Sequence, residues 1–237
     1  MSISVGKFLN NCLNIPQRLL QPECLLCGAA VENQDLCQAC LEHLPYLAPA
    51  CCKVCAVPLA QGEICGACLS EPPAFDRTHA AFSYGFPVDA LIQALKYRGN
   101  FSVVPLLAGA LEPIARSASP VDCLIPVPLS AARLRERGFN QALEIARPVA
   151  RATGVALLAT GCSRVLDCAP QAGLPWKERA KNIRGAFACE ADLSGKKVAL
   201  IDDVMTTGAT LDALAKVVRR QGAVEISVWV VARTLPK

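Results

Sequence analysis

Long apolar runs, histidines and aromatic residues are all scarce in this chain. Although 53% of its 237 residues are hydrophobic, no apolar run reaches the roughly 18 residues that a transmembrane helix needs, so no membrane-spanning segment is predicted. The apolar residues near the amino terminus are interrupted by Lys7, Asn10 and Asn14, and no clear cleavage site follows them, which argues against a signal peptide. We therefore expect a cytoplasmic protein.

The scarcity of aromatic residues and histidines also narrows the functional classes. Aromatic residues make up 5% of the chain, which argues against strong binding of single-stranded nucleic acid, since such proteins stack bases on aromatic rings. The two histidines, His43 and His79, stand outside the cysteine motifs, and we expect them to be ordinary surface or core residues. A catalytic zinc centre is not predicted, because no histidine or carboxylate interrupts the cysteine pattern.

Cysteine, in contrast, is abundant and unevenly distributed. Ten of the 14 cysteines lie between residues 12 and 68, and in a reducing compartment such a density indicates metal binding rather than disulfide bonds. Two copies of the pattern C-x₂-C-x₉-C-x₂-C follow one another with a shift of 28 residues. The eight candidate ligands are Cys24, Cys27, Cys37, Cys40, Cys52, Cys55, Cys65 and Cys68.

Each copy of the pattern predicts one structural Zn²⁺ ion, because zinc favours four tetrahedral thiolates and a C-x₂-C knuckle supplies two of them from one tight turn. The spacing also allows an interleaved arrangement in which the two copies share ligands. Cys51 is an alternative to Cys52, although the 28-residue register favours Cys52. We expect the four later cysteines to be buried as small hydrophobic residues. They are Cys123, Cys162, Cys168 and Cys189.

The pattern of the sequence changes after Pro72-Pro73. We predict a short segment at 1–20, a double zinc ribbon at 21–73 and an α/β domain at 74–237. Apolar segments alternate with amphipathic ones in the last part, which predicts a mainly parallel sheet flanked by helices. Strands are expected at 76–84, 121–127, 197–201 and 225–232, and helices at 87–97, 101–116, 140–151 and 209–221.

The most informative segment follows the predicted strand at 197–201. Two acids, Asp202 and Asp203, need hydroxyl, cation or water partners if they are buried, and adjacent ribose hydroxyls are suitable donors. The following residues form a phosphate site at a helix start, with free backbone N–H groups and a glycine that permits close approach. A simple N-cap would explain neither the acid pair nor three threonines. The predicted phosphate residues are Thr206, Thr207, Gly208, Ala209 and Thr210.

Ligands of parallel sheets bind beyond the carboxyl ends of the strands, so we expect the segments 128–139, 164–184 and 202–210 to lie together. Residues 121–237 carry 17 basic against 11 acidic residues, which favours an anionic ligand in this half. Arg133, Arg135 and Arg137 stand at alternate positions in the predicted loop 128–139. Taken by themselves they are compatible with a solvated loop or a phosphodiester contact, and their position after a core strand favours contact with an anionic ligand.

These motifs resemble a known family. The segment 198–210 resembles the signature of type I phosphoribosyltransferases, and the chain from about Cys24 to Arg233 is similar to the ComF/GntX family. Members of that family pair an amino-terminal double zinc ribbon with a phosphoribosyltransferase domain. The further matching motifs are Pro126-Val127-Pro128-Leu129, Arg137-Gly138-Phe139-Asn140-Gln141 and Gly185-Ala186-Phe187.

The resemblance implies a site for phosphoribosyl pyrophosphate (PRPP). Asp202 and Asp203 would hold the ribose hydroxyls with Mg²⁺ close by, and residues 206–210 would hold the 5-phosphate. The loop with Arg133, Arg135, Arg137 and Gly138 would face the pyrophosphate. A mobile loop would close over the reacting centre and exclude water. Its implied residues are Gln171, Trp176, Lys177, Arg179 and Asn182, with Arg179 contributing to catalysis.

Two functions are compatible with this resemblance. The first is Mg²⁺-dependent phosphoribosyl transfer to an acceptor that the sequence does not identify, because no base-recognition pocket is recognisable. The second is a binding protein in natural transformation and DNA uptake, which would bind PRPP or single-stranded DNA and dock a competence helicase or recombination mediator through its zinc ribbons. Glutamine amidotransferase chemistry is not expected, because the chain begins Met1-Ser2 without a cysteine nucleophile.

Overall fold

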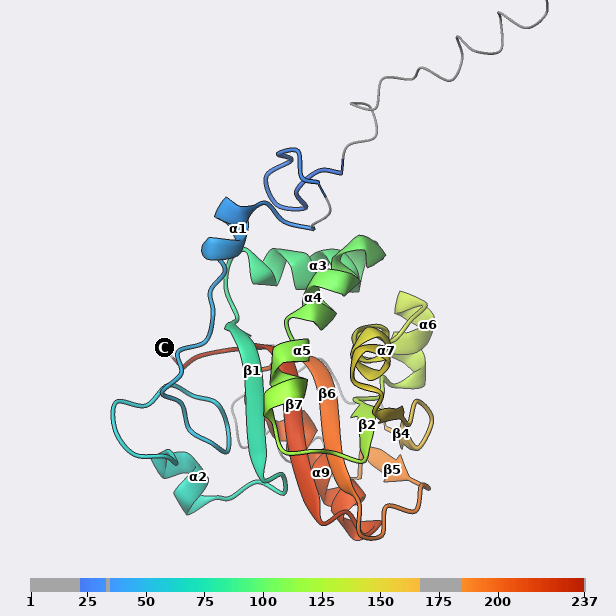
Figure 1. The fold of residues 1–237 in the computed structure, drawn as a ribbon. Helices are drawn as coiled ribbons and strands as arrows, with labels where there is room; N and C mark the ends of the chain where they lie inside the picture. Colours follow the sequence, from blue (N-terminus) through green and yellow to red (C-terminus); the bar gives the residue numbers. More distant parts are fainter. Residues whose placement is uncertain (1–21, 33–34, 167–184, 237) are drawn as a thin grey trace, which may run out of the picture. The chain divides into compact units, whose positions relative to one another are not determined.

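The computed structural model describes residues 22–32, 35–166 and 185–236 (Figure 1). It contains two compact units, Met1–Leu44 and Pro45–Lys237. The predicted segment 1–20 lies outside the described residues, as do Cys168 and all five residues of the predicted mobile loop, Arg179 included. Within the described ranges, no helix is both long and apolar enough to cross a membrane.

A five-stranded parallel sheet forms the centre of the second unit, with strand order β1-β7-β6-β2-β3. This confirms the predicted parallel sheet and the four predicted strands. Beside it, an antiparallel pair joins β4 (Cys162–Arg164) and β5 (Phe187–Cys189). In sheet order, the strands are Arg77–Ser83 (β1), Glu225–Arg233 (β7), Lys197–Met205 (β6), Cys123–Pro126 (β2) and Ala156–Leu157 (β3).

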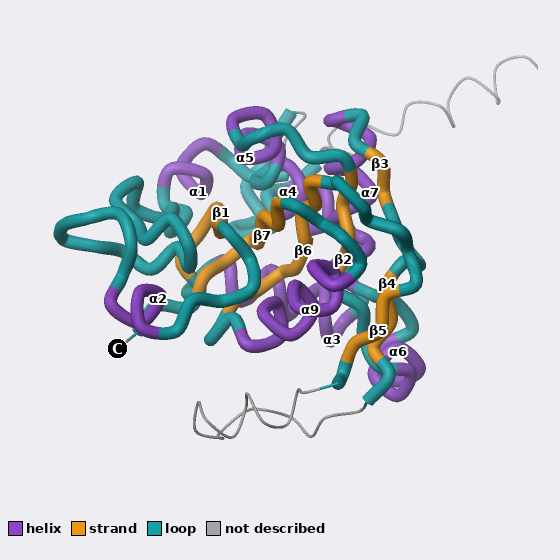
Figure 2. The backbone as a smooth tube through the Cα atoms, turned by 90° about the horizontal axis from the view of Figure 1, so that it is seen from below, coloured by secondary structure: helices purple, strands orange, loops and turns teal. Residues whose placement is uncertain are grey.

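Helices cover both faces of the sheet, and Figure 2 shows α5 and α7 on one side of the strands and α9 on the other. The helices α7 (Gln141–Thr153) and α9 (Ala209–Arg220) each bury one apolar stripe with the spacing i, i+3, i+4, i+7, which places its members on one helix face. The stripes are Ala142, Ile145, Ala146 and Val149 in α7, and Leu211, Leu214, Ala215 and Val218 in α9.

The helix predicted at 101–116 is wrong as a single element. The chain forms a 3-10 turn at Phe101–Val103 (η3), then α4 (Val104–Gly109) and α5 (Glu112–Ser117). Both α-helices carry a proline in their first turn, where the missing N–H costs nothing; inside a longer helix the same residue would remove a hydrogen bond. The neighbouring prediction at 87–97 is confirmed as α3 (Val88–Arg98), which ends at Gly99 in the left-handed region (φ 60°).

The segment predicted as an arginine-rich loop contains a helix, α6 (Ala131–Arg137). Ser130 begins it, because its Oγ accepts a hydrogen bond from the backbone N–H of Arg133 (3.4 Å), and Gly138 ends it with φ 82°. The arginines therefore project from a helix, where residues four apart share a face and residues two apart do not. Arg133 and Arg137 lie on one side of α6, and Arg135 lies on another.

Candidate functional sites

The 28-residue cysteine repeat is also a structural repeat. In the first copy, the backbone N–H of Cys24 donates to Ala29 O (2.8 Å), and in the second copy the N–H of Cys52 donates to Val57 O (2.8 Å). The short helices α1 (Gln38–Glu42) and α2 (Gly66–Ser70) are likewise 28 residues apart. Each copy thus builds the same knuckle and the same closing helix.

Each copy gathers its own four thiols, so the sequential grouping of ligands holds and the interleaved alternative is excluded. In each cluster the four Sγ atoms lie within 4.8 Å of one another. The Sγ atoms of Cys27 and Cys37 are 3.7 Å apart, and those of Cys55 and Cys65 are 3.6 Å apart. A tetrahedral zinc with Zn–S bonds of about 2.3 Å places its sulfurs roughly 3.8 Å apart. The clusters therefore fit structural zinc.

Backbone hydrogen bonds favour the thiolate form of the first cysteine in each cluster. Burial raises the pKa of Cys24 and of Cys52, but backbone N–H groups that point at the sulfur outweigh it and lower the pKa to about 6 and about 7. In the second cluster, the N–H of Cys65 donates to Cys52 Sγ at 3.3 Å. Zinc binds the thiolate form, so this backbone geometry favours metal binding.

The second cluster is built into the core of the unit Pro45–Lys237. Cys52, Cys55 and Cys68 are buried in the same apolar cluster as Phe75 and the core residues of β2, β6, β7 and α9. The domain boundary that the sequence predicts at 73/74 separates two sequence patterns and stays a prediction. In the structure, the compact unit begins at Pro45 and includes the second copy.

Arg233, at the end of β7, connects this cluster to the predicted phosphate segment. It is 6% exposed, and its Nε donates to Cys55 O (2.8 Å). The same guanidinium donates to Met205 O (3.1 Å), to Thr206 O and to Thr234 O. One buried side chain thus holds both the knuckle and the start of the segment 206–210. Apart from the apolar strand that ends at Arg233, no pattern in the sequence indicates this role.

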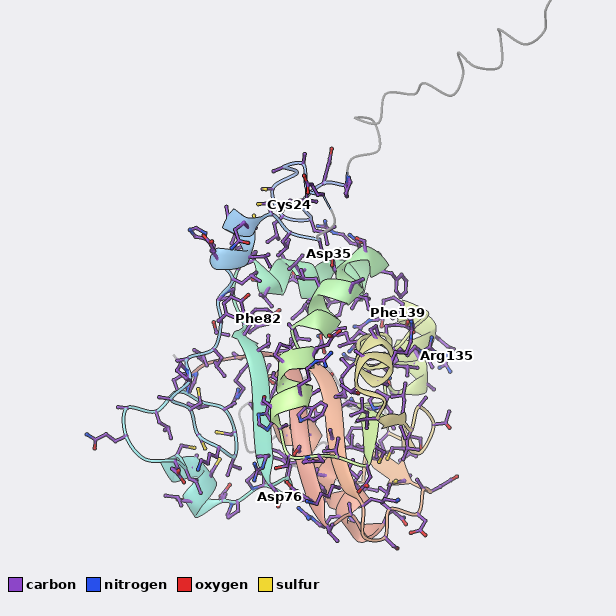
Figure 3. The ribbon with its side chains drawn as sticks, viewed as in Figure 1. Cys24, Asp35, Asp76, Phe82, Arg135 and Phe139 are labelled. Atoms are coloured by element: carbon purple, nitrogen blue, oxygen red, sulfur yellow. The ribbon has the colours of Figure 1, made fainter. Side chains whose placement is uncertain are left out.

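The acid pair lies within the last residues of β6 rather than after the strand. Asp203 is 2% exposed and Asp202 is also buried. Lys96, in the last turn of α3, forms an ion pair with Asp203 Oδ2, and Gln141 Nε2 donates to Asp203 Oδ1 (3.5 Å). Figure 3 labels Asp76 and Phe82 at the two ends of β1, which runs parallel to β6. The acid pair belongs to the carboxyl edge of the sheet, as predicted.

The two carboxyl groups differ in their electrostatics. Burial, together with the charge of Asp203, raises the pKa of Asp202 well above its ordinary value. Burial also acts to raise the pKa of Asp203, but the ammonium of Lys96 and the hydrogen bonds around it lower it below the ordinary value. In the ligand-free pair, Asp203 therefore loses its proton at a lower pH than Asp202. Both oxygens of Asp203 already have partners.

The segment after β6 leads into helix α9 through a glycine. Gly208 is the N-cap of α9 with φ 83°, a left-handed conformation that favours glycine, and a Cβ atom there would lie 2.7 Å from Met205 Cε, the flexible end of that side chain. The N-cap supplies no side-chain hydrogen bond to α9; the N–H of Ala209 donates to Thr207 Oγ1 (3.4 Å), and further first-turn N–H groups are of the kind that bind anions. The remaining predicted residues follow in order, with Thr206 exposed, Thr207 and Thr210 half-buried and Ala209 buried.

Of the three arginines of α6, Arg137 is linked to the acid pair indirectly, through Gln141. Its guanidinium donates to Gln141 Oε1 and lies over the ring of Tyr97, 5.7 Å from the ring centroid. Arg133 is half-buried one turn earlier, whereas Arg135 is exposed on the outer side of α6 (Figure 3). The helix thus connects Arg137 to Asp203 through Gln141, whereas Arg135 and Gly138 are exposed.

The sequence-based site omitted Lys96, which supplies the counter-ion of Asp203. Lys96 stands in the last turn of a predicted amphipathic helix, where a basic residue is ordinary because it complements the helix dipole. Gln141 was recognised only as part of a motif. The chain therefore carried no local signal for the network that joins Lys96, Asp203, Gln141 and Arg137.

Known proteins share this combination of modules. Residues 15–69 match the double zinc ribbon domain family, and residues 91–235 match the phosphoribosyl transferase domain family. Over 219 residues the chain is 32% identical to competence protein F from Haemophilus influenzae, a match that covers 89% of this chain and 90% of that protein. The chain belongs to the competence protein F family. The resemblance seen in the sequence is thereby confirmed.

Other members of the competence protein F family bear a different name. DNA utilization protein YhgH from Salmonella typhi is 30% identical over 220 residues, which cover 90% of this chain and 97% of that protein. Among solved structures, a purine phosphoribosyltransferase from Pyrococcus horikoshii matches 66% of this chain and 88% of its own, with 17% identity and a TM-score of 0.33.

Proposed function

We propose that this member of the competence protein F family binds PRPP with Mg²⁺ and transfers the phosphoribosyl group to an acceptor, in support of natural transformation or the use of external DNA. The observation that carries the proposal is the buried pair Asp202 and Asp203, followed along the chain by the amino terminus of α9, which has no side-chain cap at its N-cap position. A diol and a phosphate on one ribose match the chemistry of these two features. Each four-cysteine cluster would hold one structural Zn²⁺.

In this proposal the ribose hydroxyls bond to Asp202 and Asp203, the 5-phosphate meets the N–H groups after Gly208, and the pyrophosphate faces Arg137 and Arg133. The bond from C1 to the pyrophosphate oxygen breaks, and the acceptor forms the new bond to C1 through a cationic state. Mg²⁺ bound with PRPP would neutralise the departing pyrophosphate, and oxygen-rich partners of this kind suit it. Arg179 would assist from the closing loop, as the family resemblance implies.

The double substitution Asp202→Asn/Asp203→Asn tests the site. It keeps side-chain volume but removes the negative charge and replaces one acceptor oxygen of each side chain by an NH₂ donor, and hydrogen bonds to charged groups contribute about 1.5–3 kcal/mol each. We expect calorimetry with PRPP and Mg²⁺ to show binding by the unaltered protein and a loss of at least about 100-fold in the variant. Glu190→Gln, which changes an exposed acid, is the control and retains affinity. Equal PRPP affinity in the double variant would remove the ribose assignment.

Turnover is measured separately, as pyrophosphate release in the presence of nucleobases, amines or DNA ends. Release above background with one of these classes supports transfer. If release stays at background with all of them while PRPP still binds, the binding function replaces the catalytic one.

A second candidate function, binding of single-stranded DNA, is favoured by one observation. The aromatic residues are few, but three of them gather beside Arg137. Tyr97 is 76% exposed, Phe101 is also exposed, and the rings of Phe101 and Phe139 lie 4.7 Å apart. We define Tyr97, Phe101 and Phe139 as the aromatic patch. Rings of this kind beside cations stack bases and hold the phosphate backbone, so composition alone understated this possibility.

The substitution Tyr97→Ala/Phe101→Ala tests the aromatic patch. Stacking contributes about 1–3 kcal/mol per base, so we expect the affinity for a labelled single-stranded oligonucleotide, measured by fluorescence anisotropy, to fall at least tenfold. Tyr46→Ala removes another exposed aromatic residue and serves as control. If the DNA affinity changes neither with the substitution nor with the salt concentration, this function is contradicted.

A further inference from the structure

Lys96 places a positive charge directly against the acid pair. Its side chain is 20% exposed, and its ammonium forms an ion pair with Asp203 Oδ2. The charged groups that face it are Asp203, Asp202 and Arg137. Burial alone would lower the pKa of Lys96, but the charge of Asp203 raises it, so the lysine is a cation whenever the carboxylate is ionised.

The ion pair occupies a position that the proposed ligand needs. A ribose diol must donate hydrogen bonds to the carboxylate oxygens, yet Lys96 holds Oδ2 of Asp203 and Gln141 holds Oδ1. Each oxygen can accept a further hydrogen bond, but Asp203 is only 2% exposed, so a sugar hydroxyl reaches it only if one of these two partners moves away. Gln141 is itself fixed, because it is buried and accepts a hydrogen bond from Arg137. Lys96 is a compact charge on a flexible chain, and it is therefore the partner that moves.

A buried cation that leaves its carboxylate needs another anion, since an unpaired charge in a low-dielectric site is costly. The pyrophosphate of PRPP supplies one on the same side, where Arg137 already lies among the charges facing Lys96. Ribose 5-phosphate has the diol and the 5-phosphate but carries no anion at C1. If it displaced Lys96, the ammonium would be left without a counter-ion.

We propose that Lys96 exchanges partners during binding, leaving Asp203 for the pyrophosphate as the ribose diol takes its place, and that this exchange makes the site selective for ribose phosphates with an anionic group at C1. Lys96 is thus a specificity-determining residue. No covalent bond changes and no proton is transferred in the exchange. The inference rests on the proposed PRPP site.

The experiment compares two ligands, PRPP and ribose 5-phosphate, by calorimetry with Mg²⁺ in the unaltered protein, Lys96→Met and Lys96→Arg. In Lys96→Met we expect PRPP affinity to fall about 10- to 100-fold, while ribose 5-phosphate affinity stays the same or increases, because the competing ammonium has gone. The preference for PRPP therefore falls by at least tenfold. Lys96→Arg keeps a cation and retains more of the preference than Lys96→Met.

A purely structural role for Lys96 predicts a different result, namely equal losses for both ligands, and that outcome overturns the exchange. If the unaltered protein binds neither ligand, the proposed function fails rather than the role of Lys96. Should Lys96→Met not fold, a structure of the unaltered protein with PRPP decides the question. Lys96 Nζ within hydrogen-bond distance of a pyrophosphate oxygen supports the exchange, and Nζ still paired with Asp203 refutes it.

Discussion

Replacing Cys52 and Cys55 by serine is expected to unfold the unit Pro45–Lys237, whereas the matching substitution of Cys24 and Cys27 leaves that unit folded. The two pairs hold the same positions in copies 28 residues apart. Only Cys52 and Cys55, however, belong to the apolar core that also contains residues of the sheet and of α9. Apparent binding energies of structural zinc are about 10–16 kcal/mol in peptides, comparable to the about 5–15 kcal/mol that stabilises a whole domain.

Circular dichroism during heating measures the difference. Because 1 kcal/mol shifts the melting temperature by about 2–4 °C in a unit of this size, losing the about 10–16 kcal/mol of zinc binding in Cys52→Ser/Cys55→Ser should lower it by at least about 20 °C or prevent folding. Cys24→Ser/Cys27→Ser should shift the main transition by less than about 3 °C. Native mass spectrometry should find two zinc ions in the unaltered chain and one in the second variant. Equal thermal effects of both pairs would disprove the separate roles of the copies.

Arg233→Met is expected to have the next largest effect, and it acts on both stability and ligand binding. The substitution removes the buried cation itself but leaves the carbonyls of Cys55, Met205 and Thr206 without their donor. An unpaired buried acceptor costs about 1–3 kcal/mol, so we expect a loss of roughly 3–6 kcal/mol of unfolding free energy, measured by urea titration. We also expect PRPP affinity to fall at least tenfold, because the segment 206–210 loses its anchor.

Arg219→Met provides a matched comparison. Arg219 also holds several carbonyls, those of Ala74 and Val224 among them, and pairs with Asp76, but Asp76 precedes β1 at the amino edge of the sheet (Figure 3). Arg219→Met should lower the free energy of unfolding without changing the PRPP affinity of the folded protein. If Arg233→Met and Arg219→Met change PRPP affinity equally, the anchoring role of Arg233 is excluded.

Features set by short-range chemistry were predictable from the sequence. The knuckles follow from C-x₂-C spacing, because one tight turn brings both thiols together. Small residues follow them because the chain takes positive φ there, 72° at Gly28 and 58° at Ala56. The strands of the sheet follow from short apolar runs, and the acid pair with its glycine-opened helix start is a contiguous motif.

Features that depend on contacts between distant segments were not predictable. Lys96 meets Asp203 across more than 100 residues of sequence, and nothing in an amphipathic helix tells which of its basic residues will find a buried carboxylate. The arginine-rich segment does carry a helix start at Ser130 and a stop at Gly138, but its charge favoured a loop. The composition likewise shows how many aromatic residues the chain has, but not that Tyr97, Phe101 and Phe139 lie together in the folded protein.

The unequal placement of the two ribbon copies has an evolutionary consequence. In the second copy, even the backbone is committed to the rest of the molecule, since Lys53 O accepts from the N–H of Thr78 and Cys55 O accepts from Arg233. Substitutions there must satisfy the core as well as the metal. The first copy belongs to a separate compact unit, so substitutions at its non-ligand residues have only that smaller unit and its metal site to satisfy. The two copies are therefore expected to tolerate substitution to different extents.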